Sequence, residues 1–398
     1  MFKAYEYRLY PNKGQQVLLA KHFGCNRFIY NWALALRKDL YESKGESISK
    51  YELNKKITEL CKEEKYIWLK EVLTQSLQQS IQNLDTAFIK FFKEKKGFPK
   101  FKSKKTHRYS YRIPQNVKIN FENHKVYLPK LKWVNIRVDR QFTGKIKSAT
   151  VKQVPSGKYF VSILVEENSI NKKQLPITFD KAVGIDLGIK DFCILSNGIK
   201  VPNPKFLRSK EKRLKVLQKR LSRKQKGSKN REKARLKVAI QHERISNCRK
   251  DFLHKLTTKL VKENQFDTFC LETLGIQNMM KNHKLAKSIA EVSWYQFKTL
   301  LEYKAEKKGK NVVSIGIFEP SSKLCTCGYK NNELTLKDRE WTCPICHTHH
   351  DRDILAANNI KRFALSKSNI ESFSGLGRAV ELVEMSALTE STKQEESS

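Results

Sequence analysis

The charge balance constrains this chain of 398 residues more than any other feature. Its 79 lysines and arginines stand against 40 aspartates and glutamates, so the formal net charge is +39. Such an excess of one sign opposes compaction through self-repulsion and gives the fold no stability of its own. It is understandable if a bound polyanion neutralises the surface in the working state, the alternative being a general bias towards lysine. We therefore expect nucleic acid as the partner.

The chain carries no signature of a membrane or secreted protein. No run approaches the roughly 20 apolar residues that span a bilayer, and Met1-Phe-Lys-Ala-Tyr-Glu-Tyr-Arg lacks the apolar core of a signal peptide. The 9 cysteines are an odd number, and four of them gather between residues 325 and 346. This distribution favours a reducing cytoplasm and a metal site over a disulfide framework. We expect a cytoplasmic protein without a membrane partner.

The first half of the sequence alternates between strand and helix patterns. Residues 2–10 alternate as a strand does, whereas from about 13 to 95 apolar residues recur at helical spacing, as in Phe28, Trp32 and Leu36. Strand-like runs return between 109 and 168. We expect a small antiparallel β-barrel from residues 1–12 and 106–175, with a helical bundle at 13–105 inserted between its first and second strands. The clearest later strands are predicted at Val117–Phe121, Val126–Leu128, Val134–Val138 and Tyr159–Val165.

A second domain is predicted to begin near residue 180. Its apolar runs indicate buried strands, and residues 204–262 form a strongly basic helical hairpin broken at 224–230. The tail at 367–398 has little apolar periodicity, so we expect it to be disordered. The other elements expected are strands at Ala182–Ile185, Phe192–Leu195, Thr268–Leu271 and Asn311–Ile317, a helix through Trp294 and Leu301, and a final helix from about 353 to 365.

Three acidic residues occupy positions suited to catalysis. Asp186 and Glu272 each end an apolar strand, and Asp353 opens the final helix. An RNase H-like sheet would bring the ends of its first and fourth strands and this helix start together. Clustered carboxylates repel one another, and two Mg²⁺ ions would remove that penalty while activating water for phosphodiester attack. We predict these three acids as catalytic magnesium ligands, with Asp351 supporting Asp353; the alternative for Asp353 alone is a helix cap.

The cysteine cluster predicts a structural zinc site. Cys325-Thr-Cys327 and Cys343-Pro-Ile-Cys346 bracket a hairpin-like segment, and four thiolates from two turns give tetrahedral zinc coordination. The first pair is separated by one residue and the second by two. His347, His349 and His350 lie close enough to replace a poorly placed thiolate, so the ligand set stays open between four cysteines and a mixed set. We assign residues 321–347 to a zinc ribbon.

These segments together resemble a known family. The chain resembles the TnpB (OrfB) proteins encoded by bacterial insertion sequences, relatives of the type V CRISPR effectors. The resemblance runs in family order from residue 7 to about 360. It departs from the family at the short first cysteine pair and at Thr273 and Leu355, where acidic or amide residues are common. The matching segments are Tyr7-Arg-Leu-Tyr-Pro11, Gly97-Phe-Pro-Lys-Phe-Lys102, Val183-Gly-Ile-Asp-Leu-Gly188, Leu271-Glu272, Pro320-Ser-Ser-Lys323, Cys327-Gly-Tyr329, Arg339-Glu-Trp341, Cys343-Pro-Ile-Cys346 and His350-Asp-Arg-Asp353 with Ala356-Ala357.

The resemblance implies both a fold and an activity. The fold is an α+β multidomain protein in which an RNase H-like (RuvC) nuclease at 180–320 and 348–366 is interrupted by the zinc ribbon. A wedge-like β-barrel carrying a helical recognition lobe at 13–105 precedes it. The activity is RNA-guided cleavage of double-stranded DNA beside a short flanking motif, with a guide RNA derived from the transposon end. The enzyme would work in the bacterial cytoplasm and on the nucleoid. By motif position the resemblance gives Asp186, Glu272 and Asp353 as catalytic.

Other functions remain open at this level. A DDE-type transposase also uses an RNase H fold, but its acids run Asp-Asp-Glu along the chain, whereas here the order is Asp-Glu-Asp. A nuclease-inactive protein that binds a guide RNA and occupies DNA is opposed only by the intact triad. A junction resolvase would not need the regions before residue 180. The basic segment 204–250 is the favoured nucleic-acid contact, since a heteroduplex channel needs many phosphate contacts without sequence reading.

Overall fold

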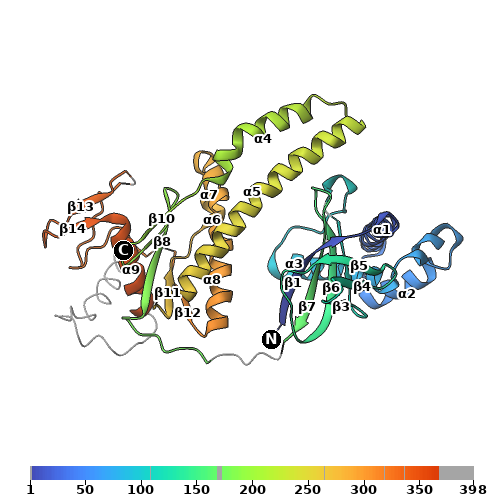
Figure 1. Cartoon of the computed structure of the whole chain (residues 1–398), viewed down its shortest axis with the longest axis horizontal. Coiled ribbons are helices and arrows are strands. Elements are labelled where there is room, and N and C mark those ends of the chain that lie inside the picture. The colour runs from blue at the N-terminus through green and yellow to red at the C-terminus, as the bar shows by residue number, and fades with distance from the viewer. Residues whose placement is uncertain are drawn as a thin grey trace. The chain divides into compact units, whose positions relative to one another are not determined.

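The computed structural model describes residues 2–107, 109–167, 173–263, 265–317, 319–335 and 337–366 (Figure 1). The chain divides into two compact units, Met1–Asn171 with Lys210–Asn247, and Lys172–Ser209 with Cys248–Ser398. The tail predicted to be disordered, 367–398, lies outside the described residues. Within the described parts of the chain, no helix is both long and apolar enough to cross a membrane.

The first unit is built on a sheet of seven antiparallel strands. Their order is β2-β6-β7-β1-β5-β4-β3, and alternate residues such as Leu9, Val126 and Ile163 point into one buried core. Among the described residues no ladder joins β2 to β3, so closure of the sheet into a barrel stays a prediction. The bounds are β1 Phe2–Tyr10, β2 Tyr109–Ile113, β3 Lys118–Asn120, β4 Lys125–Leu128, β5 Lys132–Arg137, β6 Lys145–Gln153 and β7 Tyr159–Glu166.

Helices lie between β1 and β2 in the chain. They are α1 (Lys13–Lys44), α2 (Lys50–Leu60) and α3 (Thr74–Glu94), with short 3-10 turns at Glu64–Glu71 and Lys104–Thr106. Asn12 and Ser49 each begin a helix with a capping box, which satisfies the first free backbone N–H groups. Ile29, Leu53 and Leu77 are fully buried in the core that the three helices share.

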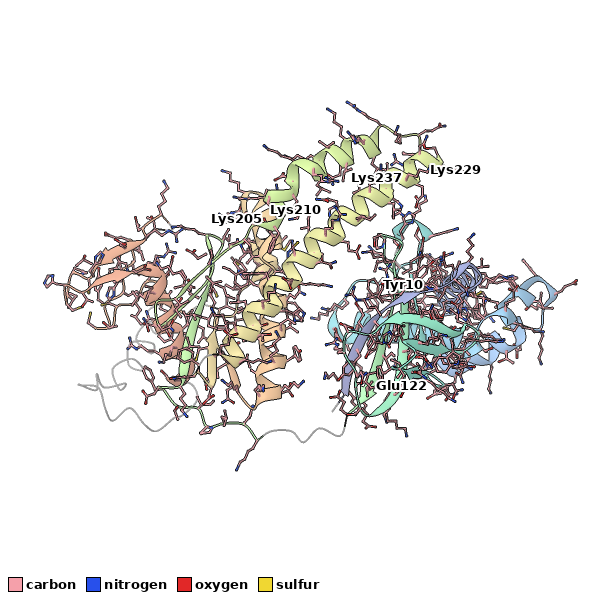
Figure 2. All side chains as sticks on the ribbon, in the orientation of Figure 1. Tyr10, Glu122, Lys205, Lys210, Lys229 and Lys237 are labelled. Atoms are coloured by element: carbon pink, nitrogen blue, oxygen red, sulfur yellow. The ribbon has the colours of Figure 1, made fainter. Side chains whose placement is uncertain are left out.

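The predicted basic hairpin is present, with its break where the sequence places it. Helix α4 spans Phe206–Ser222 and helix α5 spans Lys229–Lys262. The Arg231 guanidinium closes the tip by donating to the carbonyls of Leu221 and Lys224, each at 2.9 Å. Arg235 ties α5 to the turn between β6 and β7 through the Pro155 carbonyl at 2.9 Å. Figure 2 shows lysines from the base of α4, Lys205 and Lys210, to the start of α5, Lys229 and Lys237.

The second unit is built on a mixed sheet of five strands in the order β10-β9-β8-β11-β12. β8 pairs in parallel with β11, and β11 pairs in parallel with β12. β9 pairs antiparallel with β8, and β10 pairs antiparallel with β9. Counted along the chain, β8 and β11 are the first and fourth strands of this sheet, and they are direct neighbours. This is the arrangement expected from the positions of Asp186 and Glu272. The bounds are β8 Ala182–Leu187, β9 Asp191–Leu195, β10 Lys200–Pro202, β11 Thr268–Leu271 and β12 Asn311–Ser314.

Helices cover both faces of this sheet. Ala182 and Cys270 pack on one face against Ile360 of α9 (Arg352–Ser366). Residues of β8 and β11 that point the opposite way, such as Val183 and Phe269, pack on the other face of the sheet. There they contact α5, α7 (His283–Val292) and α8 (Trp294–Lys308). The short helix α6 (Ile276–Met279) precedes α7, and a two-stranded ribbon, β13 (Glu340–Thr342) with β14 (His349–Asp351), precedes α9. The helix predicted through Trp294 and Leu301 is α8.

Candidate active site and metal centre

Asp186 and Glu272 are placed side by side by the parallel ladder of β8 and β11. Ile185 pairs with Leu271 in the ladder, and Asp186 and Glu272 are the residues that directly follow this pair on the two strands. Neighbouring strands lie about 4.8 Å apart and side chains alternate between faces. Ala182 and Cys270 face α9, and therefore Asp186 and Glu272 also project towards the α9 side. The predicted proximity of these two acids follows from this register.

A close contact between β8 and α9 sets the position of the third acid. A Cβ at Gly184 would lie 1.8 Å from the Ala357 carbonyl oxygen, so only glycine permits this approach. Gly184 precedes Asp186 by two residues on the same strand face, and Ala357 follows Asp353 by one helical turn. Both steps cover about 6 Å along their element, which brings Asp353 opposite Asp186.

The electrostatics of the acids agree with this placement. Burial, followed by the charge of Asp353, raises the pKa of Asp186 from 3.8 to about 7. Burial, followed by the charge of Asp186, raises the pKa of Glu272 from 4.5 to about 8. Each acid is therefore destabilised in its ionised form by its neighbour, which is the condition that a bound divalent cation relieves. The donor set, carboxylate oxygens only, fits Mg²⁺.

Basic residues of the ribbon and of α9 surround Asp353. Arg339 Nη1 lies 3.3 Å from Asp353 Oδ2. The Arg352 guanidinium donates to the Thr335 and Asp338 carbonyls, each at 3.1 Å, and its charge lowers the pKa of Asp186 in opposition to burial. Both arginines fall within motifs of the sequence, but the ion pair of Arg339 with Asp353 and the electrostatic effect of Arg352 on Asp186 depend on how the ribbon folds back on α9 and were not predicted.

Asp351 caps α9 instead of facing the other acids. Its Oδ1 accepts hydrogen bonds from the backbone N–H groups of Asp353, at 3.0 Å, and Ile354, at 3.1 Å. Its Oδ2 pairs with Lys200 of β10 at 2.5 Å. Asp351 thus fixes the helix start on which Asp353 sits, which agrees with the supporting position expected for it.

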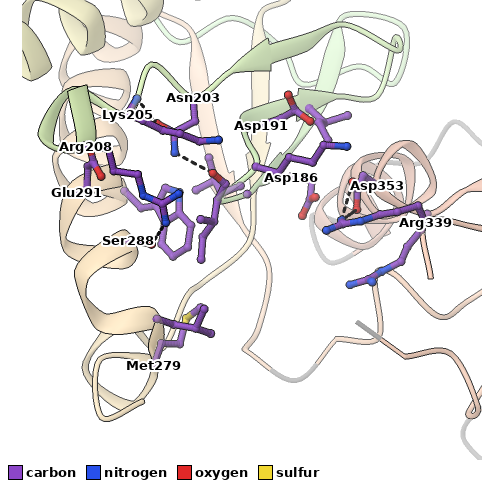
Figure 3. A pocket seen from close by; sticks show the side chains of 18 residues that line it. Asp186, Asp191, Asn203, Lys205, Arg208, Met279, Ser288, Glu291, Arg339 and Asp353 are labelled. Carbon is purple, nitrogen blue, oxygen red and sulfur yellow. Dashed lines mark hydrogen bonds and ion pairs between the residues drawn. The ribbon is translucent and has the colours of Figure 1, made fainter. Parts of the chain in front are cut away.

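A pocket of about 510 Å³ opens beside Asp186 and Asp353. Figure 3 shows Asp186 between the side formed by Arg208 and Glu291 and the side formed by Asp353 and Arg339. Glu272 is not among the lining residues. Within the described residues, the only place where three or more potential ligand atoms lie within 4.8 Å of one another is the cysteine cluster, so the three acids are spaced more widely.

The four cysteines predicted to bind zinc come together. Cys325 Sγ lies 3.5 Å from Cys346 Sγ, and Cys327 Sγ lies 3.6 Å from Cys343 Sγ. Zn–S bonds of about 2.3 Å in a tetrahedron place sulfurs about 3.8 Å apart, so the spacing fits zinc. The short first pair is accommodated by a turn in which the Gly328 N–H donates to the Cys325 carbonyl at 3.1 Å. Gly328 takes a φ of 97°, a value that favours glycine.

The ribbon core reaches both His350 and the nuclease helix. His350 Nε2 lies 3.0 Å from Cys325 Sγ, so this histidine neighbours the sulfur cluster and packs on Trp341. Leu355 of α9 is buried in the same small core as Cys325 and Cys343. The apolar side chain of Leu355 therefore packs the ribbon onto α9. Thr273 donates to the Ile315 carbonyl at 2.6 Å and joins the ends of β11 and β12.

Family models match three stretches of the chain. A model described as "Probable transposase" (OrfB_IS605) matches residues 162–283, and a Cas12f1-like TNB domain matches 294–360. A model described as "Helix-turn-helix domain" matches residues 1–46. In the structure the described part of that last stretch holds strand β1 and the single helix α1, so its backbone is not a helix-turn-helix.

Whole-chain relatives extend these matches. A Streptomyces pristinaespiralis protein named "Putative RNA-guided DNA endonuclease" is 40% identical over 370 residues, covering 92% of this chain and 90% of the relative. The Escherichia coli K12 protein "Putative RNA-guided DNA endonuclease InsQ" is 31% identical over 373 residues, covering 90% and 91%. A solved Cas12f1–sgRNA–target DNA complex contains a chain of 15% identity with a TM-score of 0.56, covering 91% of this chain and 98% of that one.

Fold and relatives together define the class. The likeness to the Cas12f1 chain shows that the two chains share a fold, which in this protein has a mixed α/β sheet and an associated cysteine cluster. The chain belongs to the TnpB (OrfB) family. The resemblance drawn from its sequence motifs is thereby confirmed.

Proposed function

We propose that this protein is an RNA-guided DNA endonuclease that hydrolyses phosphodiester bonds at Asp186, Glu272 and Asp353. The single observation that carries the proposal is the convergence of these three acids from two parallel strands and one helix start. Two relatives with more than 30% identity along nine-tenths of the chain are named as RNA-guided DNA endonucleases. These names support the proposal that an RNA guide directs the reaction.

The acids would hold two Mg²⁺ ions. Bound there, the ions would activate a water molecule and stabilise the leaving oxygen of an in-line attack. Asp186 interacts electrostatically with both of the other acids, since it raises the pKa of Glu272 and has its own pKa raised by Asp353. It is therefore the central residue of the three that would hold the ions. Arg339 and Arg352 supply positive charge on the open side of the site, where a phosphate would approach.

The zinc ribbon would act as a structural support for Asp353. Zinc on the four cysteines would fix the two turns of the ribbon. Leu355 packs on this core, and Arg339 reaches from the ribbon to Asp353. A loaded ribbon would thus hold both the start of α9 and the arginine that faces its carboxylate.

The remaining surfaces would bind the nucleic acids. The basic segment 204–250 would follow the phosphates of the guide–target heteroduplex, since most of its lysines and arginines are exposed. The seven-stranded sheet and the helices inserted in it would hold the guide RNA, which derives from the transposon end, and would read the short motif that flanks the target. Single residues for the last task are not assigned.

The guide is tested by the RNA that the protein carries. The protein is expressed together with the DNA that flanks its gene, purified at high salt, and its bound RNA is sequenced. We expect one abundant species that starts in the 3′ region of the gene and runs past the end of the element. A heterogeneous mixture of cellular RNA would contradict the guided reading and leave the charge of +39 as a general polyanion-binding surface.

A further inference from the structure

The pocket beside the catalytic acids has a second, chemically different half. Its acidic end is formed by Asp186 and Asp353, whereas its opposite wall comes from helices α6 to α8 and from the chain that follows β8. The apolar side chains that line the pocket are Leu187, Ile189, Ile194, Met279, Leu285 and Trp294. A metal site alone requires no apolar wall, so this half has a different ligand chemistry.

Hydrogen bonds hold the mouth of the pocket in place. Buried Glu291 accepts from the Leu207 N–H at 2.5 Å and so fixes the first turn of α4 on α7. Arg208, one residue further on, donates to Ser288 at 3.3 Å. Asn203 donates to the Ile189 carbonyl at 2.8 Å, which anchors the chain leading to Lys205. The cations Lys205 and Arg208 therefore stand at the rim over a preformed apolar wall (Figure 3).

Trp294 lies buried behind this wall. Its side chain is 4% exposed, and its Nε1 is buried without a hydrogen-bond partner within the described residues. A buried tryptophan N–H usually has a partner. The Trp294 N–H is therefore an unpaired buried donor next to the pocket.

We propose that this apolar half binds the base and sugar of the nucleotide next to the scissile phosphate, on the DNA strand that is cut. The inference rests on the proposed nuclease function, because the acids fix where the phosphate must lie. A base attached to that phosphate reaches the adjoining space, which is lined by apolar side chains in front of the buried Trp294 and has cations at its rim. Such surfaces bind unstacked bases. The volume of about 510 Å³ lies in the range of pockets that hold small organic ligands.

Filling the pocket tests the proposal. Ser288→Trp places a large side chain on an α7 residue that lines the pocket, whereas Ala290→Trp places the same side chain on an exposed residue of α7 that does not line it. Both variants are purified as complexes with their RNA, and their far-UV circular dichroism and unfolding temperature are compared with the wild type. Cleavage rates are then measured on guide-matched DNA and on the same DNA with a single abasic nucleotide at each position around the cut.

The expected pattern is a coupling between one protein residue and one base. In the wild type and in Ala290→Trp, an abasic nucleotide at one position beside the cut should slow cleavage by roughly 5- to 150-fold, the range that loss of one stacked base gives. Ser288→Trp should cut intact DNA at that reduced rate and show no further loss with the abasic strand. DNA binding without Mg²⁺ should be the same for all three proteins.

The experiment distinguishes failure of the proposed nuclease function from failure of the nucleotide pocket. If the folded wild-type complex does not cut guide-matched DNA, the proposed function is wrong and the nucleotide pocket falls with it. If the wild type cuts and folded Ser288→Trp cuts equally fast, only the pocket proposal is overturned. The same holds if the reduction in cleavage rate caused by Ser288→Trp multiplies with the reduction caused by the abasic nucleotide. Leu285→Trp, at another lining position of α7, repeats the test if Ser288→Trp does not fold.

Discussion

Asp186 and Glu272 hold equivalent positions on neighbouring parallel strands, each one residue beyond the register pair of Ile185 and Leu271. Their side chains therefore converge on the face that α9 covers, and the charge of Asp186 adds to burial in raising the pKa of Glu272. Without a cation the arrangement costs stability. With one it becomes a ready-made set of oxygen ligands.

The first prediction concerns stability against pH. The pKa values of Asp186 and Glu272 are raised to about 7 and about 8, so between about pH 4 and pH 8 the folded chain keeps protons that the unfolded chain has lost. The metal-free protein should therefore lose stability as the pH rises through that window. Mg²⁺ should raise the unfolding temperature more at pH 8 than at pH 5.

Thermal unfolding of Asp186→Asn checks the origin of this effect. This variant should show a smaller loss of stability with pH and a smaller stabilisation by Mg²⁺, whereas Glu122→Gln, at an exposed position between β3 and β4, should behave as the wild type does. An unchanged pH profile in Asp186→Asn would contradict the assignment.

The second prediction concerns the contact of Gly184 with Ala357. Gly184→Ala forces a methyl group onto the Ala357 carbonyl, so β8 and α9 must separate, at a cost of at least about 1–3 kcal/mol. Cleavage should fall with it because Asp353 moves away from Asp186. Gly24→Ala in α1, where a Cβ would meet no atom within 4 Å, should instead stabilise by about 0.5–1 kcal/mol. Hydrogen exchange localised to α9 measures the first effect, and normal protection there in Gly184→Ala would refute it.

The third prediction concerns the zinc ligands. The sulfur spacing favours four cysteines, with His350 as a neighbour of the Cys325 sulfur and not a ligand. The purified protein should contain one zinc per chain, Cys343→Ser should lose it, and His350→Ala should keep it. Elemental analysis of the three proteins, with exposed His347→Ala as the control, decides between the two sets. Loss of zinc from His350→Ala alone would show a mixed site.

The fourth prediction concerns the basic hairpin. Lys219, Arg220 and Arg223 are exposed near the end of α4. If each neutralises one phosphate, their joint replacement by alanine should reduce the slope of log affinity against log salt by about 2–3. Replacing the exposed lysines Lys262, Lys307 and Lys308, at the ends of α5 and α8, supplies a control of equal charge change. Fluorescence anisotropy with the guide-matched DNA gives both slopes, and equal slopes would place the heteroduplex elsewhere.

The local part of the site could be predicted from sequence because its signals are local. Apolar runs that end in Asp186 and Glu272 indicate strands, and a basic stretch interrupted at 224–230 indicates a helical hairpin. The ribbon was predictable from its cysteines, although the one-residue gap raised a doubt that only the turn at Gly328 resolves.

Long-range features were not predictable in the same way. Neither the pairing of Arg339 with Asp353 nor the apolar pocket leaves a periodic signal, since each joins segments more than ten residues apart. The close approach at Gly184 is another example, because a lone glycine in a strand pattern does not say which backbone comes near. The closure of the first sheet depends on edge strands β2 and β3 and stays a prediction.

The most direct test of the central claim is programmed cleavage. The protein is purified with a guide RNA whose terminal segment has been replaced by a chosen sequence, and it is incubated with Mg²⁺ and a plasmid that carries the complementary site beside the native flanking motif. The account predicts cutting at that site only, abolished in Asp186→Asn, Glu272→Gln and Asp353→Asn while each variant keeps its RNA. Cutting that ignores the guide, or that persists in Asp186→Asn, would contradict it.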